Sequence, residues 1–508
     1  MFAKSYGAVT LGVDGKIIDV EVDMSLGFPS YDVVGLLDTA VKESKERVRT
    51  AIKNAGVKLN PARVMINLAP ADLRKDSAGL DLPIAMGLLS AYGIIPAERI
   101  QKMLFAAELS LEGELRTVRG VLPMAVAGRE AGFEEMVVSP DNAQEALLVD
   151  GIRIYAPTSL AALIAFLQGK ADISPAVPAD NSTEIGDFGE DFADVQGQFQ
   201  AKRALEIAAA GGHNVLMVGA PGAGKTMLAR RLPTILPPMT KQEALDVTKI
   251  YSIAGLLKQG SGLIEERPFR SPHHTTSTVA MIGGGSVPRP GEVTLSNHGV
   301  LFLDELPEFS KQTLEVLRQP LEDAEVTIAR VNATLTFPSR MILVCAMNPC
   351  PCGWNGDKDR SCDCTPYEIK RYTRKISGPL LDRIDIHIRV PRVEYKELTA
   401  REKAESSAAI RQRVLEAREL QRKRLEGYGI YSNAEMGQAV LKETCRMTTE
   451  AQALLKQAFD VMQLSARSYA RIIKVARTIA DLDRREQIEA KHVGEAISLR
   501  NDVGLNIE

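Results

Sequence analysis

A short glycine-rich segment carries the residues with the clearest chemical purpose in this sequence. It reads GAPGAGKT, after an apolar run at 214–218 and before helix-like residues at 227–232. Strand, glycine turn and helix in this order place backbone N–H groups and a helix N-terminus around phosphate oxygens. We expect Lys225 to reach the β- and γ-phosphates and Thr226 to hold Mg²⁺. A glycine turn without function is the alternative to this nucleoside triphosphate site. The predicted site residues are Gly219, Ala220, Pro221, Gly222, Ala223, Gly224, Lys225 and Thr226.

Two carboxylates follow a second apolar run, GVLFL at 299–303. Asp304, at the end of this expected strand, is predicted to face the phosphate loop and to bind Mg²⁺ through water. Glu305 is predicted to orient the water that attacks the terminal phosphate. An Asp-Glu pair after a strand is a weak signal alone. Downstream of a phosphate loop it indicates that the triphosphate is hydrolysed.

Length and composition limit the possible classes of protein. A chain of 508 residues is long enough for about three domains. Its net charge of −3 gives no general affinity for nucleic acid, so such contacts would need local basic patches. No signal peptide is apparent at the N-terminus, and the longest apolar stretch, 83–95, is shorter than the ~20 residues of a membrane span. We expect a cytoplasmic protein without a membrane partner.

The first 170 residues alternate strand-like and helix-like segments. They resemble the Lon-protease-like α+β domain of several ATPases, through the segments at 67–73, 75–83 and 111–123. The resemblance raises a peptidase hypothesis with Ser77 as nucleophile. A serine needs a nearby base, and the matching segment 119–122 (RGVL) has no lysine. We therefore expect a scaffold or substrate-docking domain.

Residues 171–190 are rich in proline, serine and aspartate, which is typical of a linker. Shortly afterwards come Phe192, Val195 and Gln196, at the distance before the phosphate loop where AAA+ ATPases commonly contact the adenine ring. By that resemblance they are candidate adenine contacts. A plain strand that begins the domain is the alternative.

Three further residues match AAA+ positions. Asn348 ends an apolar strand at 341–347 and matches the sensor that positions the attacking water, unless it only begins a turn. Arg383 matches the arginine finger that enters the neighbouring subunit's site, which implies an oligomer; a surface pair with Asp382 is the alternative. Arg467 is expected to complete the site of its own chain from the C-terminal helices, with Arg471 as a weaker candidate.

The stretch between the phosphate loop and Glu305 is longer than a minimal AAA+ core needs. It contains RPFRSPHH, GGG and PGEV, followed by GVLFLDELPEF, and these motifs resemble magnesium-chelatase-related AAA+ ATPases. Together with the front domain and a cysteine block, the resemblance is to the YifB/ComM family. It implies a hexameric, ATP-driven DNA helicase that migrates branches while transforming DNA is integrated by homologous recombination. Adjacent His273 and His274 could suggest a metal, but a structural role is favoured.

Two loops are candidate DNA contacts. A glycine-rich tip at 283–285 with Arg289 is expected to be mobile, and a hairpin at 326–337 carries Arg330 and Asn332 near its turn. Loops of this kind in the channel of a ring can hold a phosphate backbone independently of base sequence. For Arg289 and Arg330, a subunit contact or a surface role is the alternative.

Four of the six cysteines lie within 15 residues, as two C-x-C pairs. Four thiolates can bind Zn²⁺ tetrahedrally and cross-link a loop that has no core of its own. The spacing is tighter than the usual C-x₂-C, so reduced thiols and a disulfide remain alternatives. The candidate zinc ligands are Cys350, Cys352, Cys362 and Cys364.

The predicted fold class is α/β: an AAA+ P-loop ATPase core with a helical lid, preceded by a Lon-protease-like α+β domain. The expected divisions are 1–170, a linker at 171–190, the core at 191–393, and the lid at 394–508. A homo-hexamer using ATP, Mg²⁺ and Zn²⁺ to move along branched or junction DNA is the leading hypothesis. A motor for a chelatase-like assembly and an ATP-dependent peptidase are the alternatives.

Overall fold

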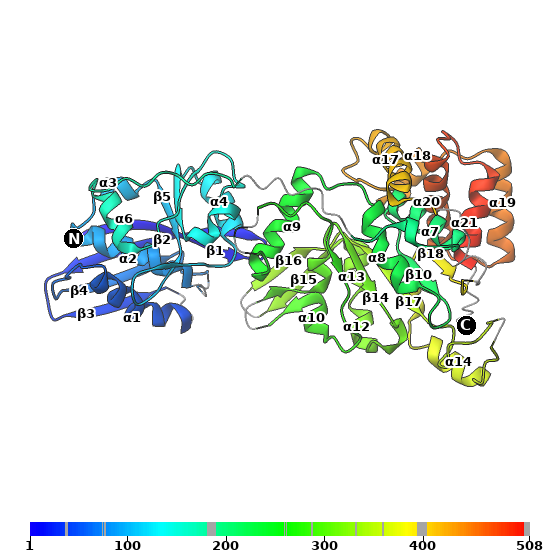
Figure 1. Cartoon of the computed structure of the whole chain (residues 1–508), viewed down its shortest axis with the longest axis horizontal. Helices are drawn as coiled ribbons and strands as arrows, with labels where there is room; N and C mark the ends of the chain where they lie inside the picture. The colour runs from blue at the N-terminus through cyan, green and yellow to red at the C-terminus, as the bar shows by residue number, and fades with distance from the viewer. Residues whose placement is uncertain are drawn as a thin grey trace.

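The computed structural model describes residues 1–35, 39–73, 75, 78–179, 189–258, 260, 262–285, 288–330, 333–357, 360–393 and 404–501. Three parts follow one another along the long axis in chain order (Figure 1): a sheet domain, a second α/β domain, and a group of helices. The predicted fold class is confirmed. No helix in the described ranges is both long enough and apolar enough to cross a bilayer.

The N-terminal domain is built on a seven-stranded mixed sheet in the order β3-β4-β2-β1-β5-β8-β9. The alternation of apolar and acidic residues in β2 places Ile18, Val20 and Val22 in the core. The strands are β1 (Phe2–Leu11), β2 (Asp14–Ser25), β3 (Ser30–Val34), β4 (Arg63–Ala69), β5 (Met103–Ala106), β8 (Glu135–Val138) and β9 (Arg153–Tyr155), with a small ladder of β6 (Glu108–Leu109) and β7 (Leu115–Arg116). The helices are α1 (Thr39–Asn54), α2 (Asp81–Ala91), α3 (Ala97–Ile100), α4 (Val121–Glu130), α5 (Ala143–Ala146) and α6 (Leu160–Leu167).

The N-terminal domain extends beyond its predicted end. The Ala176 N–H donates to the Ile154 carbonyl oxygen (2.8 Å), and Gln144 bonds the backbone of Val177 and Ala179. The first half of the predicted linker therefore lies on the domain. Its proline-rich composition indicated an irregular backbone correctly, but not that this backbone is docked. Residues 180–188 of the predicted linker are outside the described residues.

The second domain has a five-stranded parallel sheet in the order β11-β14-β17-β10-β18. Residues in β10, β14 and β17 are almost all buried, as strands covered on both faces by helices must be. The strands are β10 (Val215–Val218), β11 (Phe269–Arg270), β14 (Val300–Leu303), β17 (Ile342–Met347) and β18 (Ile386–Arg389). Two ladders stand apart from this sheet: β12 (Gly283–Gly284) with β13 (Arg289–Pro290), and β15 (Glu325–Arg330) with β16 (Ala333–Pro338). The helices are α7 (Phe199–Gly211), α8 (Lys225–Ile235), α9 (Lys241–Ala254), α10 (Thr278–Ile282), α11 (Glu292–Leu295), α12 (Lys311–Glu315), α13 (Arg318–Asp323), α14 (Pro366–Thr373) and α15 (Gly378–Leu381).

The C-terminal helices share one apolar core with this sheet. Val414 and Ile472 belong to the same buried cluster as Val215 and Ile386, which shows that the helices pack on the domain instead of forming a separate one. Residues 394–403, where the predicted lid begins, are outside the described residues. The helices are α17 (Ser407–Arg424), α18 (Gln438–Thr444), α19 (Thr449–Val461), α20 (Ala466–Leu482) and α21 (Ala490–Asn501).

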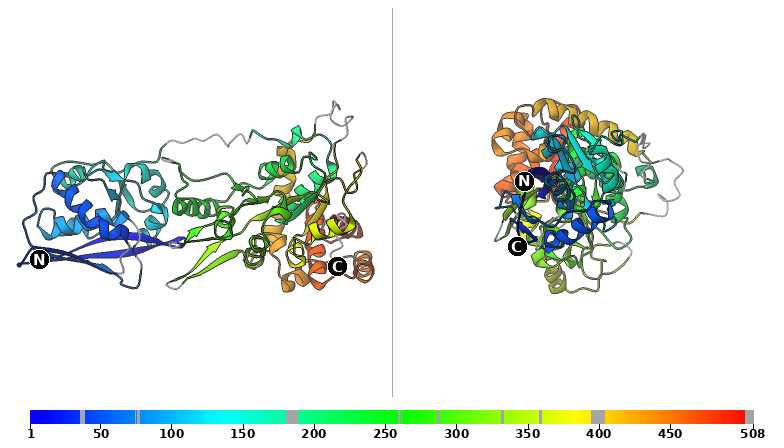
Figure 2. Two further views of the ribbon diagram at one scale, coloured as in Figure 1. Left: turned by 90° about the horizontal axis from the view of Figure 1, so that it is seen from below. Right: turned by 90° about the vertical axis from the view of Figure 1, so that its left-hand side faces the viewer.

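Among the described residues, contacts between the N-terminal domain and the second domain involve α9 and the β15–β16 hairpin. The Ser252 hydroxyl at the end of α9 donates to Glu145 (2.7 Å), and burial raises the pKa of this carboxyl group. In addition, Leu11 and Val13 at the β1–β2 turn pack against the cluster that contains Leu335 of β16. Figure 2 shows the long β1–β2 hairpin reaching towards the middle of the molecule. A structural route therefore connects this domain with the β15–β16 hairpin.

Because His387 on β18 is buried, we expect the stability of the protein to depend on pH. Burial, and next the charge of Arg500, lower the pKa of His387 to about 4. The unfolded chain has a histidine pKa of about 6.5, so between these values it binds more protons than the folded chain. The free energy of unfolding should therefore fall as the pH falls through this window, by about 2 kcal/mol at pH 5. Chemical denaturation at pH 7.5 and pH 5 measures this, and His387→Gln should lose part of the difference. An unchanged pH dependence in the variant would contradict the assignment.

Candidate functional site

The predicted phosphate loop joins the carboxyl end of β10 to α8. Gly222 (φ 74°) and Gly224 (φ 85°) adopt left-handed backbone conformations, which glycine reaches without steric cost. Gly224 immediately precedes α8, so the loop wraps round the N-terminus of that helix. This is the arrangement in which successive N–H groups and a helix dipole attract an anion.

Four of the predicted site residues, Lys225, Thr226, Asp304 and Asn348, meet at one edge of the sheet. Asp304 follows β14 and Asn348 follows β17, and β17 lies between β14 and β10 with all three strands parallel. The Thr226 hydroxyl donates to Asp304 (2.7 Å), and the Lys225 ammonium group donates to Asn348 Oδ1 (3.2 Å). Thr226 and Asp304 together provide the hydroxyl and carboxylate oxygens that suit Mg²⁺.

Lys225 lies along its own loop. Its ammonium group donates to the carbonyl oxygens of Gly219 (2.7 Å) and Ala220 (3.0 Å). Burial lowers the pKa of Lys225, while the negative charges of Asp304 and Glu305 act in the opposite direction. The ammonium group is thus held along the loop by backbone carbonyl oxygens, and the carboxylates that follow β14 favour its charged form.

Glu305 is exposed and conformationally strained. Its φ is 52°, a left-handed value that costs of order 1–3 kcal/mol in a residue other than glycine. The Asp304 carboxylate accepts its backbone N–H (2.9 Å), which helps to hold this conformation. The side chain is 59% exposed, so the carboxylate is accessible to water. Strain at an exposed carboxylate beside a phosphate loop fits the predicted role in orienting water.

His274 is a site residue that the sequence did not indicate. Its Nδ1 lies 3.4 Å from Glu305 Oε2, and its ring packs on that of His273 with centroids 4.0 Å apart. The only signal was the HH pair itself, considered for metal binding. A ring nitrogen at this position can hold the Glu305 carboxylate in one orientation.

We expect His274→Ala to lower kcat for ATP hydrolysis by about 10-fold while the KM for ATP changes little, since the contact orients Glu305 without touching the loop. Steady-state kinetics test this, with His273→Ala as the matched control because His273 Nδ1 lies by Thr275 (2.9 Å) instead. His274→Asn, which keeps a polar group, should restore part of the rate. Equal losses in the two alanine variants would contradict a specific role.

The predicted adenine contacts do not line an open surface. Phe192 and Val195 have no exposed surface and belong to the core shared with the C-terminal helices, whereas Gln196 is partly exposed. The alternative, a plain strand that begins the domain, is not found either, because Phe192–Asp194 forms a short 3₁₀ helix. Gln198 was missed: its side-chain amide bonds the carbonyl oxygens of Ala223 (3.2 Å) and Pro391 (2.6 Å), which ties the phosphate loop to the end of β18.

Arg383 lies at the opposite edge of the sheet from the phosphate loop. Its carbonyl oxygen accepts from Asn214 (3.1 Å) at the amino end of β10. The length of β10 separates its amino end from the phosphate loop at its carboxyl end by about 13 Å. The guanidinium group is nearly buried, pairs with Glu322 and donates to the Pro379 carbonyl oxygen (2.6 Å). Arg383 therefore cannot reach its own phosphate loop here, and its ionic partner is Glu322 instead of Asp382.

Arg467 lies beside Arg383, which corrects the expectation that it completes the site of its own chain. Its guanidinium group is 4.0 Å from Glu322 and its side chain is 65% exposed. The reason is that α20 packs at the amino end of the core sheet. Arg471, the weaker candidate, pairs with Asp385; although burial raises the pKa of Asp385, the charge of Arg471 and the contact with His213 hold it far below its usual range. Arg471 is thus a structural link between the sheet and the helices.

The two candidate DNA loops are neighbours. A Cβ added at Gly283 would lie 3.1 Å from Ile328 Cδ1 of β15, so the β12–β13 and β15–β16 ladders pack together. Arg289 is exposed on β13, whereas the side chain of Arg330 and all of Asn332 are outside the described residues. The described parts of the two ladders therefore lie next to each other.

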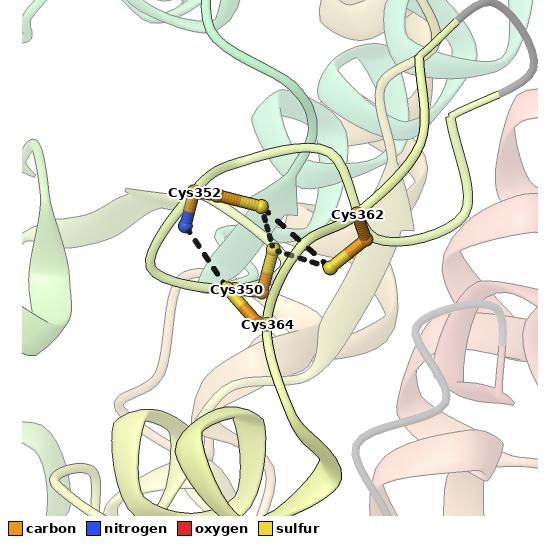
Figure 3. A group of neighbouring side chains, drawn as sticks. All are labelled: Cys350, Cys352, Cys362 and Cys364. Atoms are coloured by element: carbon orange, nitrogen blue, oxygen red, sulfur yellow. Dashed lines mark hydrogen bonds between the residues drawn. The ribbon is translucent and has the colours of Figure 1, made fainter.

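The four clustered cysteines converge in the loop between β17 and α14 (Figure 3). Their sulfur atoms all lie within 4.8 Å of one another. Cys350 Sγ is 3.3 Å from Cys352 Sγ and 3.6 Å from Cys362 Sγ, well beyond the ~2.05 Å of a disulfide. Backbone N–H groups of Cys352 and Asn355 donate to the sulfurs of Cys364 and Cys350. The geometry is compatible with a metal ion held by thiolates.

The Lon-like segment of the N-terminal domain is anchored by a buried carboxylate. Asp81 accepts from the Arg47 guanidinium (2.9 Å) and the Ser44 hydroxyl. Although Arg47 and Ser44 oppose it, burial raises the pKa of Asp81. Ser77 itself is outside the described residues, so the peptidase hypothesis rests on the sequence alone. The contacts of Asp81 thus give this residue of the Lon-like segment a structural role.

Three family models match the chain: "Magnesium chelatase, subunit ChlI" over residues 191–398, "Subunit ChlI of Mg-chelatase" over 20–142, and "Magnesium chelatase, subunit ChlI C-terminal" over 404–500. The competence protein ComM of Haemophilus influenzae is 41% identical over 505 residues, which cover 98% of this chain and 97% of that protein. The YifB protein of Escherichia coli is 42% identical over 96% of this chain and 95% of its own length. Lon protease 2 of Bacillus subtilis is 30% identical over 160 residues, 28% of each chain.

Proposed function

Because this chain belongs to the magnesium-chelatase-related family that includes ComM and YifB, we propose that it is an ATP-driven, ring-forming motor that moves DNA. The reaction that this motor drives is branch migration during homologous recombination of transforming DNA. The ring is a homo-hexamer in the cytoplasm. Its cofactors are ATP with Mg²⁺ at the phosphate loop and Zn²⁺ at the four-cysteine group.

The observation that supports the proposal is that the predicted ATP-site residues lie at two opposite edges of the core sheet. Lys225, Thr226, Asp304 and Glu305 lie near one edge, and Arg383 lies at the other. A head-to-tail contact between subunits brings such opposite edges together, and rings arise when the rotation closes. Each ATP would then be hydrolysed between two subunits, with Arg383 offsetting phosphoryl charge.

The DNA part of the proposal draws on the neighbouring β12–β13 and β15–β16 ladders. Gly283 is closely packed at the base of this ladder, and the exposed Arg289 lies opposite Gly284. A cationic loop presented by each subunit would hold the phosphate backbone without reading bases. The competence name of the Haemophilus influenzae relative fits a role in handling incoming DNA.

The test is ATPase stimulation and strand displacement on a branched DNA substrate. We expect DNA to raise the ATPase rate, and Lys225→Ala to abolish both activities. No effect of DNA, with porphyrin-dependent turnover instead, would favour a chelatase-like motor. ATP-dependent casein degradation would favour a peptidase.

Arg289→Ala tests the DNA contact more finely. It should weaken DNA binding for all sequences and reduce the salt dependence of binding by about one charge, while basal ATPase activity stays unchanged. Arg116→Ala, another exposed arginine, on β7, is the matched control. An equal salt dependence in both variants would remove Arg289 from the DNA contact.

A further inference from the structure

The cysteine loop has the dimensions of a tetrahedral thiolate site. With metal–sulfur bonds of about 2.3 Å, tetrahedral zinc places its sulfur ligands about 3.8 Å apart. The contacts among Cys350, Cys352 and Cys362 are 3.3–3.6 Å, and Cys364 completes the group within 4.8 Å. Figure 3 shows the side chains pointing toward one another from the two ends of the loop.

The sequence of the loop offers only one large apolar side chain that could pack against its surroundings. Apart from Trp354, its side chains between residues 349 and 364 are small or polar. Trp354 is only partly buried, and the guanidinium groups of Arg360 and Arg392 lie 4.4 Å and 5.5 Å from the centre of its ring. Cation–π contacts of this exposed kind contribute about 0.5–1 kcal/mol each. A structural zinc ion contributes much more, because its binding energy becomes folding energy.

The loop is also in direct contact with the nucleotide site. Cys350 is separated from Asn348 by a single proline, whose fixed φ makes the link stiff. Gly353, with φ 87°, lies so close to the phosphate loop that a Cβ there would be 2.6 Å from Pro221 Cδ. The cysteine loop is therefore joined directly to Asn348, the predicted sensor residue, and also contacts the phosphate loop at Pro221.

We propose that a Zn²⁺ ion bound by these four thiolates positions Asn348 and the phosphate loop, so that zinc occupancy sets the rate of ATP hydrolysis. The inference rests on the proposed ATPase function and extends it. Asn348 accepts from Lys225 Nζ (3.2 Å), so a shift of the loop moves a group in direct contact with the phosphate-binding lysine. A misplacement of about 1 Å in an active site can cost about 10²-fold in rate.

The test compares zinc content with turnover in the full-length chain. We expect protein purified without oxygen to contain one Zn²⁺ per chain by elemental analysis. Cys362→Ser/Cys364→Ser should lose the metal and about 10- to 100-fold in kcat, with the Kd for ATP changed by less than about 3-fold. Cys445→Ala is the matched control, because this buried cysteine lies in the C-terminal helices. It should keep both metal and rate.

Trp354 is the only tryptophan of the chain, so its fluorescence reports on this loop. Addition of a slowly hydrolysed ATP analogue with Mg²⁺ should change the emission of zinc-loaded protein but not of protein depleted with a zinc-selective chelator. Refilling with Zn²⁺ should restore the response and kcat together. This second measurement uses the natural sequence, so it holds even where the double variant fails to fold.

The outcomes separate the two proposals. Wild-type protein without stoichiometric metal, or zinc-free protein with normal kcat, would overturn the inference and leave the ATPase intact. Wild-type protein without ATPase activity would overturn the proposed function. The inference would then be decided by the Trp354 fluorescence measurement. If the ATP analogue changed the emission equally with and without zinc, the inference would be rejected.

Discussion

Glu305→Gln is expected to bind ATP normally and to hydrolyse it at least about 10²-fold more slowly. The substitution keeps the size of the side chain and a polar oxygen facing His274. An amide, however, cannot take a proton from water. General base catalysis is typically worth about 10²–10⁴-fold. Because the group is exposed and strained at φ 52°, the loss should fall on kcat. Single-turnover hydrolysis and equilibrium binding of a fluorescent ATP analogue measure the two effects separately.

Lys225→Ala provides the contrast. It removes the ammonium group that lies along the phosphate loop, so nucleotide binding itself should be lost. Glu308→Gln is a matched control for Glu305, since Glu308 is a neighbouring carboxylate that pairs with Lys375 (3.2 Å). Hydrolysis by Glu305→Gln at the wild-type rate, or an equal loss in Glu308→Gln, would remove Glu305 from its proposed role.

Arg383→Ala is expected to lower kcat by about 10³-fold or more, the range of arginine fingers, and the defect should be complemented between subunits. Arg383→Ala subunits retain an intact phosphate loop, and Lys225→Ala subunits retain Arg383. Each variant alone should be inactive. A one-to-one mixture should regain activity at about a quarter of the interfaces, where the two intact halves meet. ATPase assays over a range of mixing ratios measure this.

Glu322 separates this role from a structural one. If Arg383 acts only through its ion pair with Glu322, Glu322→Ala should reproduce the defect of Arg383→Ala. If Arg383 acts in a neighbouring site, Glu322→Ala should leave most of the ATPase activity. Inactive mixtures together with an inactive Glu322→Ala variant would remove the finger assignment.

The central strands β10, β14 and β17 and the phosphate loop of the nucleotide domain could be predicted, because their signals are local. Buried parallel strands read as short apolar runs, and the phosphate loop needs glycines at fixed positions. Asp304 and Asn348 could be placed together for the same reason, since each follows such a run and parallel strands end at one edge. Those predictions required only that the strands form one parallel sheet, and few strand arrangements are allowed for such a sheet.

What the sequence could not predict concerns residues whose position depends on packing between distant segments. Phe192 appeared as a candidate adenine contact, yet it is buried among residues from the C-terminal helices. Residues 171–179 appeared as linker, yet Ala176 bonds β9. Neither partner is near in sequence, so no local pattern carried the information.

The sequence by itself determined a phosphate-binding loop, its two acidic partners and a group of four cysteines, because their chemistry requires particular residue types at short spacing. Only the tertiary structure decided how these parts meet. It brought His274 to Glu305, set Arg467 beside Arg383, and pressed Gly353 against Pro221. Each of these contacts joins segments that approach only when the sheet and helices pack, and packing depends on the shape of the whole core.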